Sequence, residues 1–186
     1  MWGVTDDEVA RPYPCDGVFT GPTVEWFRGV DVDAEPAAVF RWLCQLSVAP
    51  YSYDLVDNLG RRSPQRLTPG LERLTVGQTM MTIFELASFA EGEHLTVRMR
   101  PGPGRRAFGD LLVSYAIHPA EPAEPAEPAE PAGPGRSRLV AKLVLPTDQD
   151  LRHRIARPLL AWGDLIMMRR QLHNLARLAA QRGNVS

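Results

Sequence analysis

Residues 26–43 read WFRGVDVDAEPAAVFRWL, and the period of the apolar residues changes within this stretch. Before Asp33 apolar and polar side chains alternate, which predicts a strand over Thr23–Asp33. Its inner face would carry Val24, Trp26, Val30 and Val32. After Asp33 the period is helical, and Pro36 falls in the first turn, where its missing N–H breaks no hydrogen bond. The pattern predicts a helix over Ala34–Leu46, with Asp33 as its N-cap and with Val39, Leu43 and Leu46 on the apolar face.

Four further strands are predicted downstream, after a loop-rich stretch over Ser47–Gly77. Gln78–Phe89 is apolar on both faces, as in a strand that is covered on both sides. His94–Arg100 alternates strictly, with Leu95, Val97 and Met99 inward. Asp110–His118 and Ser137–Pro146 alternate in the same way, so they form the arms of a hairpin.

Residues 119–135, between these two arms, repeat Pro-Ala-Glu and contain no side chain that could build a core. Proline at every third position favours an extended polyproline II conformation. The segment is therefore predicted to be a hairpin insert. It is either a tolerated surface expansion or an arm that presents its glutamates to a basic partner.

The last predicted element is a long helix over Thr147–Gln181, which Pro158 must kink or split. Spacing of 100° per residue gives one wide apolar arc on this helix. The arc holds Ala161, Trp162, Leu165, Ile166, Met168, Leu172, Ala176 and Ala179. Arg169 and His173 fall within the same arc, one turn apart.

The order of strand, helix, antiparallel strands and closing helix predicts an α+β domain. It resembles the START-like helix-grip (SRPBCC) superfamily, whose opening strand and helix start are matched by residues 26–43. Residues 49–64, 76–78 and 162–172 resemble a bacterial subgroup with polyketide cyclase/dehydrase-like and lipid-transport-like relatives. The resemblance implies a curved antiparallel β-sheet wrapped around a long C-terminal helix, with small helices after the first strand. It also implies an apolar cavity between sheet and helix.

The resemblance to the START-like superfamily sets the expected limits of the domain. Residues 22–182 would form one START-like ligand-binding domain that carries the 119–135 insert. Residues 1–21 are expected to be a flexible leader and 183–186 a tail.

Composition excludes several classes of protein. The 186 residues carry a net charge of −1 and are 44% hydrophobic, which argues against a disordered chain and gives no general basic signal for nucleic acid. No apolar run reaches the roughly 18 residues of a membrane span, and the acidic start is unlike a signal peptide. Two cysteines and four scattered histidines lack metal-ligand spacing, and no cofactor motif is present. We therefore expect a cytoplasmic protein without metal or cofactor.

Two groups of residues are candidates for a binding site. Arg169 and His173 would mark a polar corner of the cavity, where a carboxylate, phosphate or enolate oxygen could bind. Alternatively Arg169 extends to the rim and His173 bonds to a backbone carbonyl. Tyr51, Tyr53 and Asp54 form the second group, which either lines the cavity or holds a loop together. Trp162 and Ile166 would supply apolar lining.

The predicted function is binding of a hydrophobic or amphipathic small molecule, lipid- or polyketide-like, in that cavity. The alternative is a cyclase or dehydratase that uses Tyr51, Tyr53, Asp54, Arg169 and His173 in the same cavity. It would need a tyrosine or histidine beside Asp54 as an acid–base pair. A protein-interaction domain is the third alternative, and it would use the glutamate-lined insert.

Overall fold

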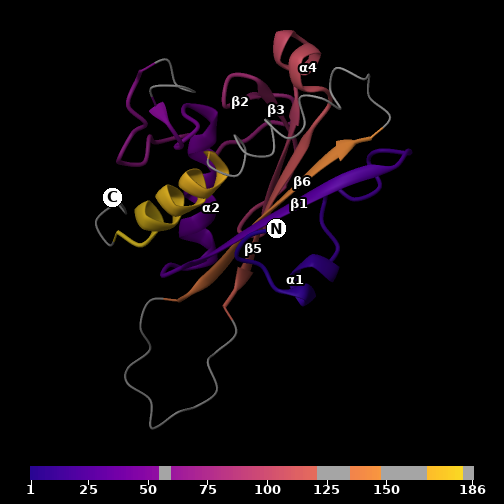
Figure 1. The fold of residues 1–186 in the computed structure, drawn as a ribbon. Coiled ribbons are helices and arrows are strands. Elements are labelled where there is room, and N and C mark those ends of the chain that lie inside the picture. The colour runs from indigo at the N-terminus through magenta and orange to yellow at the C-terminus, as the bar shows by residue number, and fades with distance from the viewer. Residues whose placement is uncertain (55–59, 121–134, 148–166, 182–186) are drawn as a thin grey trace.

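The computed structural model describes residues 1–54, 60–120, 135–147 and 167–181. Its centre is a six-stranded antiparallel sheet in the order β1-β6-β5-β4-β3-β2 (Figure 1). The strands are β1 (Thr23–Val32), β2 (Thr79–Met80), β3 (Phe84–Ala90), β4 (His94–Met99), β5 (Leu112–Pro119) and β6 (Ser137–Pro146). The helices are α1 (Asp6–Ala10), α2 (Pro36–Cys44) with the 3₁₀ turn η1 (Gln45–Ser47), α4 (Pro103–Phe108), and a C-terminal helix described over 167–179.

The first and last strands are neighbours in the sheet. β1 pairs with β6 over its whole length, from Thr23 opposite Pro146 to Val32 opposite Ser137. The β5–β6 hairpin stays paired up to Pro119 and Ser137, so the Pro-Ala-Glu insert leaves the sheet at a hairpin end, as the sequence predicts. Residues 121–134 of the insert lie outside the described residues.

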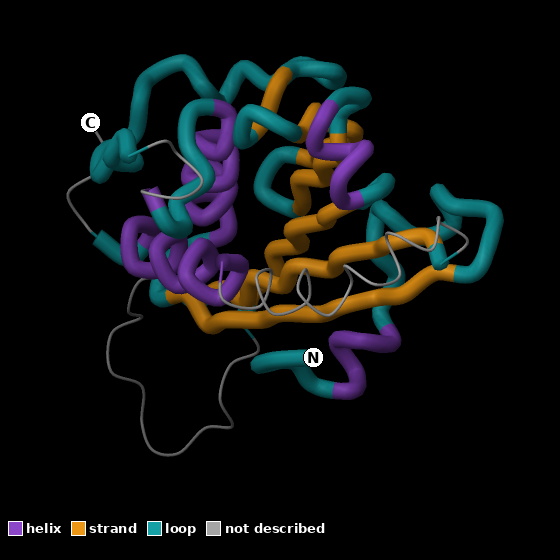
Figure 2. Tube along the Cα trace, turned by 45° about the horizontal axis from the view of Figure 1, so that its top comes forward, coloured by secondary structure: helices purple, strands orange, loops and turns teal. Residues whose placement is uncertain are grey.

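One face of the sheet carries the main core. Alternating side chains of β1, β4, β5 and β6 pack there against α2 and the C-terminal helix, which lie on the same side of the sheet (Figure 2). Leu43, Tyr115, Leu139 and Leu172 are fully buried in this layer. A curved antiparallel sheet that holds the C-terminal helix is the α+β helix-grip architecture expected from the sequence.

The opposite face of the sheet is covered by residues 1–21, which the sequence analysis treats as a flexible leader. Tyr13 and Cys15 are buried there against Phe27, Val140 and Val144. Lys142, the only lysine of the chain, is also buried on this face and pairs with Asp16 and Glu25. The leader is therefore a packed segment, because the outer face of β5 and β6 offers an apolar surface that it covers.

Two element predictions need correction. Gln78–Phe89 is not one strand: β2 and β3 form a short hairpin, and Met81 and Thr82 turn the chain with φ of 44° and 67°. The N-cap of α2 is Glu35 rather than Asp33, whose carboxylate instead pairs with Arg136 at 3.1 Å. Pro158 lies outside the described residues.

Candidate functional site

The C-terminal helix is rotated relative to the predicted arc. Within residues 167–179 the buried side chains are Met168, Gln171, Leu172, Leu175 and Leu178. Arg169 and His173 are exposed. Arg169 therefore reaches the surface, as one of the two alternatives predicts, and neither residue is buried with the apolar side chains of the arc. A polar residue occupies the buried face instead, because the amide of Gln171 is fully engaged there. Its Oε1 accepts a hydrogen bond from the Tyr115 hydroxyl at 2.7 Å.

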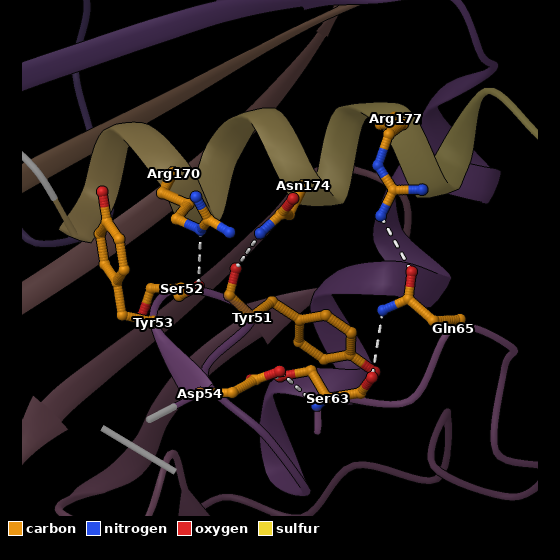
Figure 3. A pocket seen from close by; sticks show the side chains of 9 residues that line it. All are labelled: Tyr51, Ser52, Tyr53, Asp54, Ser63, Gln65, Arg170, Asn174 and Arg177. Carbon is orange, nitrogen blue, oxygen red and sulfur yellow. Dashed lines mark hydrogen bonds between the residues drawn. The ribbon is translucent and has the colours of Figure 1, made fainter. Parts of the chain in front are cut away.

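Three helix side chains hold three consecutive carbonyls of the loop that follows η1. Figure 3 shows two of these contacts, those of Arg170 and Asn174. Gln171 Nε2 donates to the Pro50 carbonyl at 2.6 Å, and Asn174 Nδ2 donates to the next carbonyl at 2.8 Å. Arg170 Nε donates to the Ser52 carbonyl at 3.1 Å. Because one rigid helix supplies all three donors, the backbone of residues 50–52 is fixed beside it.

Tyr51, in the middle of this fixed segment, has a left-handed backbone with φ of 56°. Its side chain is 1% exposed, and its ring meets Trp42 edge-on at 5.8 Å between centroids. Figure 3 shows the ring pointing from the loop toward Ser63 and Gln65. The hydroxyl has no hydrogen-bond partner among the described residues. Burial, together with the charge of Asp54, raises the pKa of this hydroxyl well above its usual value.

Asp54 holds the end of the same loop. Its two carboxylate oxygens accept hydrogen bonds from the Ser63 amide at 2.9 Å and from the Ser63 hydroxyl at 2.5 Å. Its carbonyl accepts a bond from the Gly60 amide at 2.7 Å. These bonds match the loop-holding alternative of the sequence analysis, because Asp54 closes the loop between residues 54 and 63.

A pocket of about 380 Å³ lies between this loop and the helix. Polar groups from both elements surround it (Figure 3): Tyr51, Ser52, Tyr53, Asp54, Ser63, Gln65, Arg170, Asn174 and Arg177. It lies beside the helix face that carries Arg170 and Asn174. The neighbouring face, toward the sheet, is filled by Tyr115, Leu172 and Leu175, each 0–1% exposed.

A second pocket of about 460 Å³ shares Tyr53, Arg170 and Asn174 with the first, and Arg169 and His173 complete its lining. Aromatic rings hold both of its arginines. The Arg169 guanidinium carbon lies 4.9 Å from the centroid of the Trp2 ring, and that of Arg170 lies 4.7 Å from the Tyr53 ring. The His173 ring meets Trp2 edge-on at 5.3 Å.

The structure thus brings together five of the seven residues predicted for the site. Tyr51, Tyr53 and Asp54 line the first pocket, whereas Tyr53, Arg169 and His173 line the second. Trp162 and Ile166 lie outside the described residues.

Sequence reasoning missed Trp2, Arg170 and Asn174. Trp2 belongs to the supposed leader, and its backbone joins the edge of β1 through bonds to Phe27 and Gly29. Arg170 and Asn174 lie one helical turn apart, on the side of the helix opposite the predicted apolar arc. That spacing is the one local signal of a shared face.

No family model matches the chain, and no curated protein matches its sequence. Norcoclaurine synthase from Thalictrum flavum is structurally similar, with 11% identity over 87% of this chain and 96% of that chain and a TM-score of 0.49. A major latex protein family member from Arabidopsis thaliana has 14% identity, coverage of 83% and 95%, and a TM-score of 0.40. A Chromobacterium violaceum protein has 11% identity, coverage of 86% and 98%, and a TM-score of 0.43.

Among the described residues, no three His, Cys, Asp or Glu side chains are grouped so that they could hold a metal ion. No described helix combines the length and apolar character needed to cross a membrane.

Proposed function

We propose that this protein binds an amphipathic small molecule, lipid- or polyketide-like in its apolar part, whose polar end enters the pocket beside Tyr51. The observation that carries the proposal is the unpartnered, buried hydroxyl of Tyr51. An unsatisfied buried hydroxyl costs about 1–3 kcal/mol, and a left-handed backbone at a non-glycine residue costs roughly as much. A bound molecule that hydrogen-bonds to this hydroxyl would offset the first cost.

The surroundings of the hydroxyl support this proposal. The two joined pockets, of about 380 and 460 Å³, each fall in the size range typical of small-molecule sites. Their polar groups are held in place by a helix, which reduces the ordering cost of binding. Tyr53 adds an exposed ring against which an apolar chain could pack. Trp162 and Ile166 remain the proposed contacts for the rest of the apolar part.

The described residues give a cyclase or dehydratase less support. An acid–base pair would need the carboxylate of Asp54 to face a tyrosine or histidine, but both of its oxygens accept bonds from Ser63. The proposal therefore includes no reaction. A cytoplasmic location, with neither a nucleic acid nor a metal as partner, also stays a prediction.

The test is ligand binding by the wild type and by Tyr51→Phe. Native mass spectrometry of the purified protein would detect molecules that copurify with it. Displacement of a neutral apolar dye, N-phenyl-1-naphthylamine, would then rank single-chain amphiphiles. Because Tyr51→Phe removes one hydrogen bond of about 1 kcal/mol, affinity should fall about fivefold.

Tyr13→Phe is the matched control, because its hydroxyl donates to the Glu8 carbonyl at 2.7 Å on the opposite face of the sheet. Its affinity for the same amphiphiles should equal that of the wild type. Failure of every amphiphile to displace the dye would overturn the proposal. Equal affinity of the wild type and Tyr51→Phe would show that the Tyr51 hydroxyl does not bond to the bound molecule.

A further inference from the structure

The side chains that line the second pocket carry positive charge and no negative charge. Its lining side chains are Tyr53, Arg169, Arg170, His173 and Asn174, which offer two positive charges and no carboxylate. Elsewhere in the described residues arginines pair with acids: Arg98 and Arg105 with Asp110, and Arg138 with Glu8. Among the described residues no acid forms an ion pair with Arg169 or Arg170.

Aromatic stacking positions these two arginines without using their hydrogen-bond donors. The guanidinium carbons of Arg169 and Arg170 lie over the Trp2 and Tyr53 rings, at 4.9 and 4.7 Å from the ring centroids. The N–H donors lie in the guanidinium plane, at its edges, where they form the fork that matches a carboxylate or phosphate. Arg170 uses its Nε for the Ser52 carbonyl, which fixes the group, and its side chain lines the pocket.

The two arginines also come from a single rigid element. Arg169 and Arg170 are adjacent on the C-terminal helix, and His173 and Asn174 follow one turn later. Residues one turn apart share a face, so the guanidinium, imidazole and amide groups line one pocket. This pocket shares Tyr53, Arg170 and Asn174 with the pocket beside Tyr51.

From this arrangement we infer that Arg169, Arg170 and His173 form a subsite for an oxyanion, a carboxylate or a phosphate, at the polar end of the bound molecule. The inference rests on the proposed function and narrows its ligand class to acidic amphiphiles. Trp2 acts as a positioning residue, because it contacts Arg169 and His173.

Three probes of the same chain length distinguish a failure of this inference from a failure of the proposed function. Dodecanoate, dodecyl phosphate and 1-dodecanol differ only in the head group. Their affinities are measured by displacement of N-phenyl-1-naphthylamine from the full chain. A charge-assisted hydrogen bond contributes more than a neutral one, so both anions should bind at least about tenfold more tightly than the alcohol. The tighter of the two anions then shows which head group the subsite prefers.

The variant Arg169→Gln should lose most of this preference and keep the affinity for dodecanol, because Arg169 does not line the pocket beside Tyr51. Arg136→Gln is the charge-matched control, because Arg136 pairs with Asp33 at the foot of the hairpin, and it should behave as the wild type. Circular dichroism and thermal unfolding of each variant would show that the fold is retained. In NMR titrations dodecanoate should shift the side-chain signals of Arg169 and His173.

The results that would contradict the inference differ in whether they also overturn the proposed function. If dodecanol binds as tightly as the anions, or if Arg169→Gln keeps the preference, the oxyanion subsite is overturned and the proposed function stands. If none of the three probes displaces the dye, both are overturned. Arginine-dependent binding to phosphatidylglycerol vesicles without any preference among the monomeric probes would place the anion at a lipid surface and overturn the subsite.

Discussion

Tyr51 and Tyr115 are two buried tyrosines whose hydroxyls differ in their surroundings. Both rings are 0–1% exposed. The Tyr115 hydroxyl donates to Gln171 Oε1 at 2.7 Å and so links β5 to the C-terminal helix. The Tyr51 hydroxyl has no partner among the described residues. Replacement of each tyrosine by phenylalanine therefore compares the loss of a hydrogen-bonded hydroxyl with the loss of an unbonded one.

We expect Tyr115→Phe to lower the free energy of unfolding by about 1–3 kcal/mol, because the amide oxygen of Gln171 loses its donor in the core. Tyr51→Phe should leave stability unchanged or raise it by up to about 1 kcal/mol, since it removes an unpartnered polar atom. Urea unfolding of both variants measures the difference. If Tyr51→Phe loses as much stability as Tyr115→Phe, its hydroxyl is bonded in solution.

The N-terminal segment, residues 1–21, is the element whose role changes most between sequence and structure. Glu8 pairs with Arg138 at 2.6 Å, and Asp16 pairs with Lys142 at 2.5 Å. Trp2 bonds to the edge of β1 and contacts the C-terminal helix. The segment thus connects the outer face of the sheet with the helix that carries the candidate site.

Glu8 should make the attachment of this segment sensitive to acid. Burial by itself would raise the pKa of the Glu8 carboxyl, but bonds from Arg138 and from the Thr5 amide outweigh it and hold the pKa below 4.5. A carboxyl with a lowered folded pKa stabilises the fold above its unfolded pKa, and this contribution is lost as the pH falls through the folded pKa. We therefore expect faster hydrogen exchange in residues 1–21 at about pH 3 than at about pH 6, after correction for intrinsic rates.

Glu8→Gln isolates this effect. It should loosen the segment at neutral pH, because an ion pair becomes a neutral contact, and it should flatten the dependence on pH. An unchanged acid dependence in Glu8→Gln would assign the effect to another carboxyl. Thr5, the N-cap of α1, retains its own side-chain bond to the Glu8 amide in this variant.

At the scale of the whole molecule, the sheet is covered on both faces. α2 and the C-terminal helix bury one face, while Tyr13, Cys15 and their apolar neighbours bury the other. The structure therefore extends the packed unit to include residues 1–21, which precede the domain start predicted at residue 22.

A chain that begins at residue 22 should lose at least about 3 kcal/mol of stability, because a fully buried apolar side chain contributes about 1.5–3 kcal/mol and several would be uncovered. The uncovered residues include Phe27, Leu112, Val140 and Val144. Urea unfolding would measure the loss, and size-exclusion chromatography would detect self-association through the bared face. Removal of residues 183–186 serves as the control. An unchanged midpoint would make the segment dispensable for folding.

The sequence predicted the strands well where apolar and polar residues alternate. Leu95 and Val97 on β4, and Leu139 and Ala141 on β6, face the core as their spacing requires. The turn at Met81 and Thr82 was missed, because neither residue is a usual turn former and both adopt positive φ. The Met81 backbone amide donates a hydrogen bond to the Leu46 carbonyl, at 2.8 Å, and this contact with another element holds the turn.

The sequence by itself determined the order of the main strands and helices, the inward faces of the strands and the place of the hairpin insert. The periods of strand and helix and the constraints of proline act between near neighbours, so these features can be read locally. Tertiary structure alone decided which face of the C-terminal helix is buried and where residues 1–21 go. Gln171 lies inside because Tyr115 and the Pro50 carbonyl, more than 50 residues away, satisfy its amide. Arg169 lies outside because Trp2, at the other end of the chain, supplies a ring for it. Such partners have no spacing in the sequence, so only the folded chain brings them together.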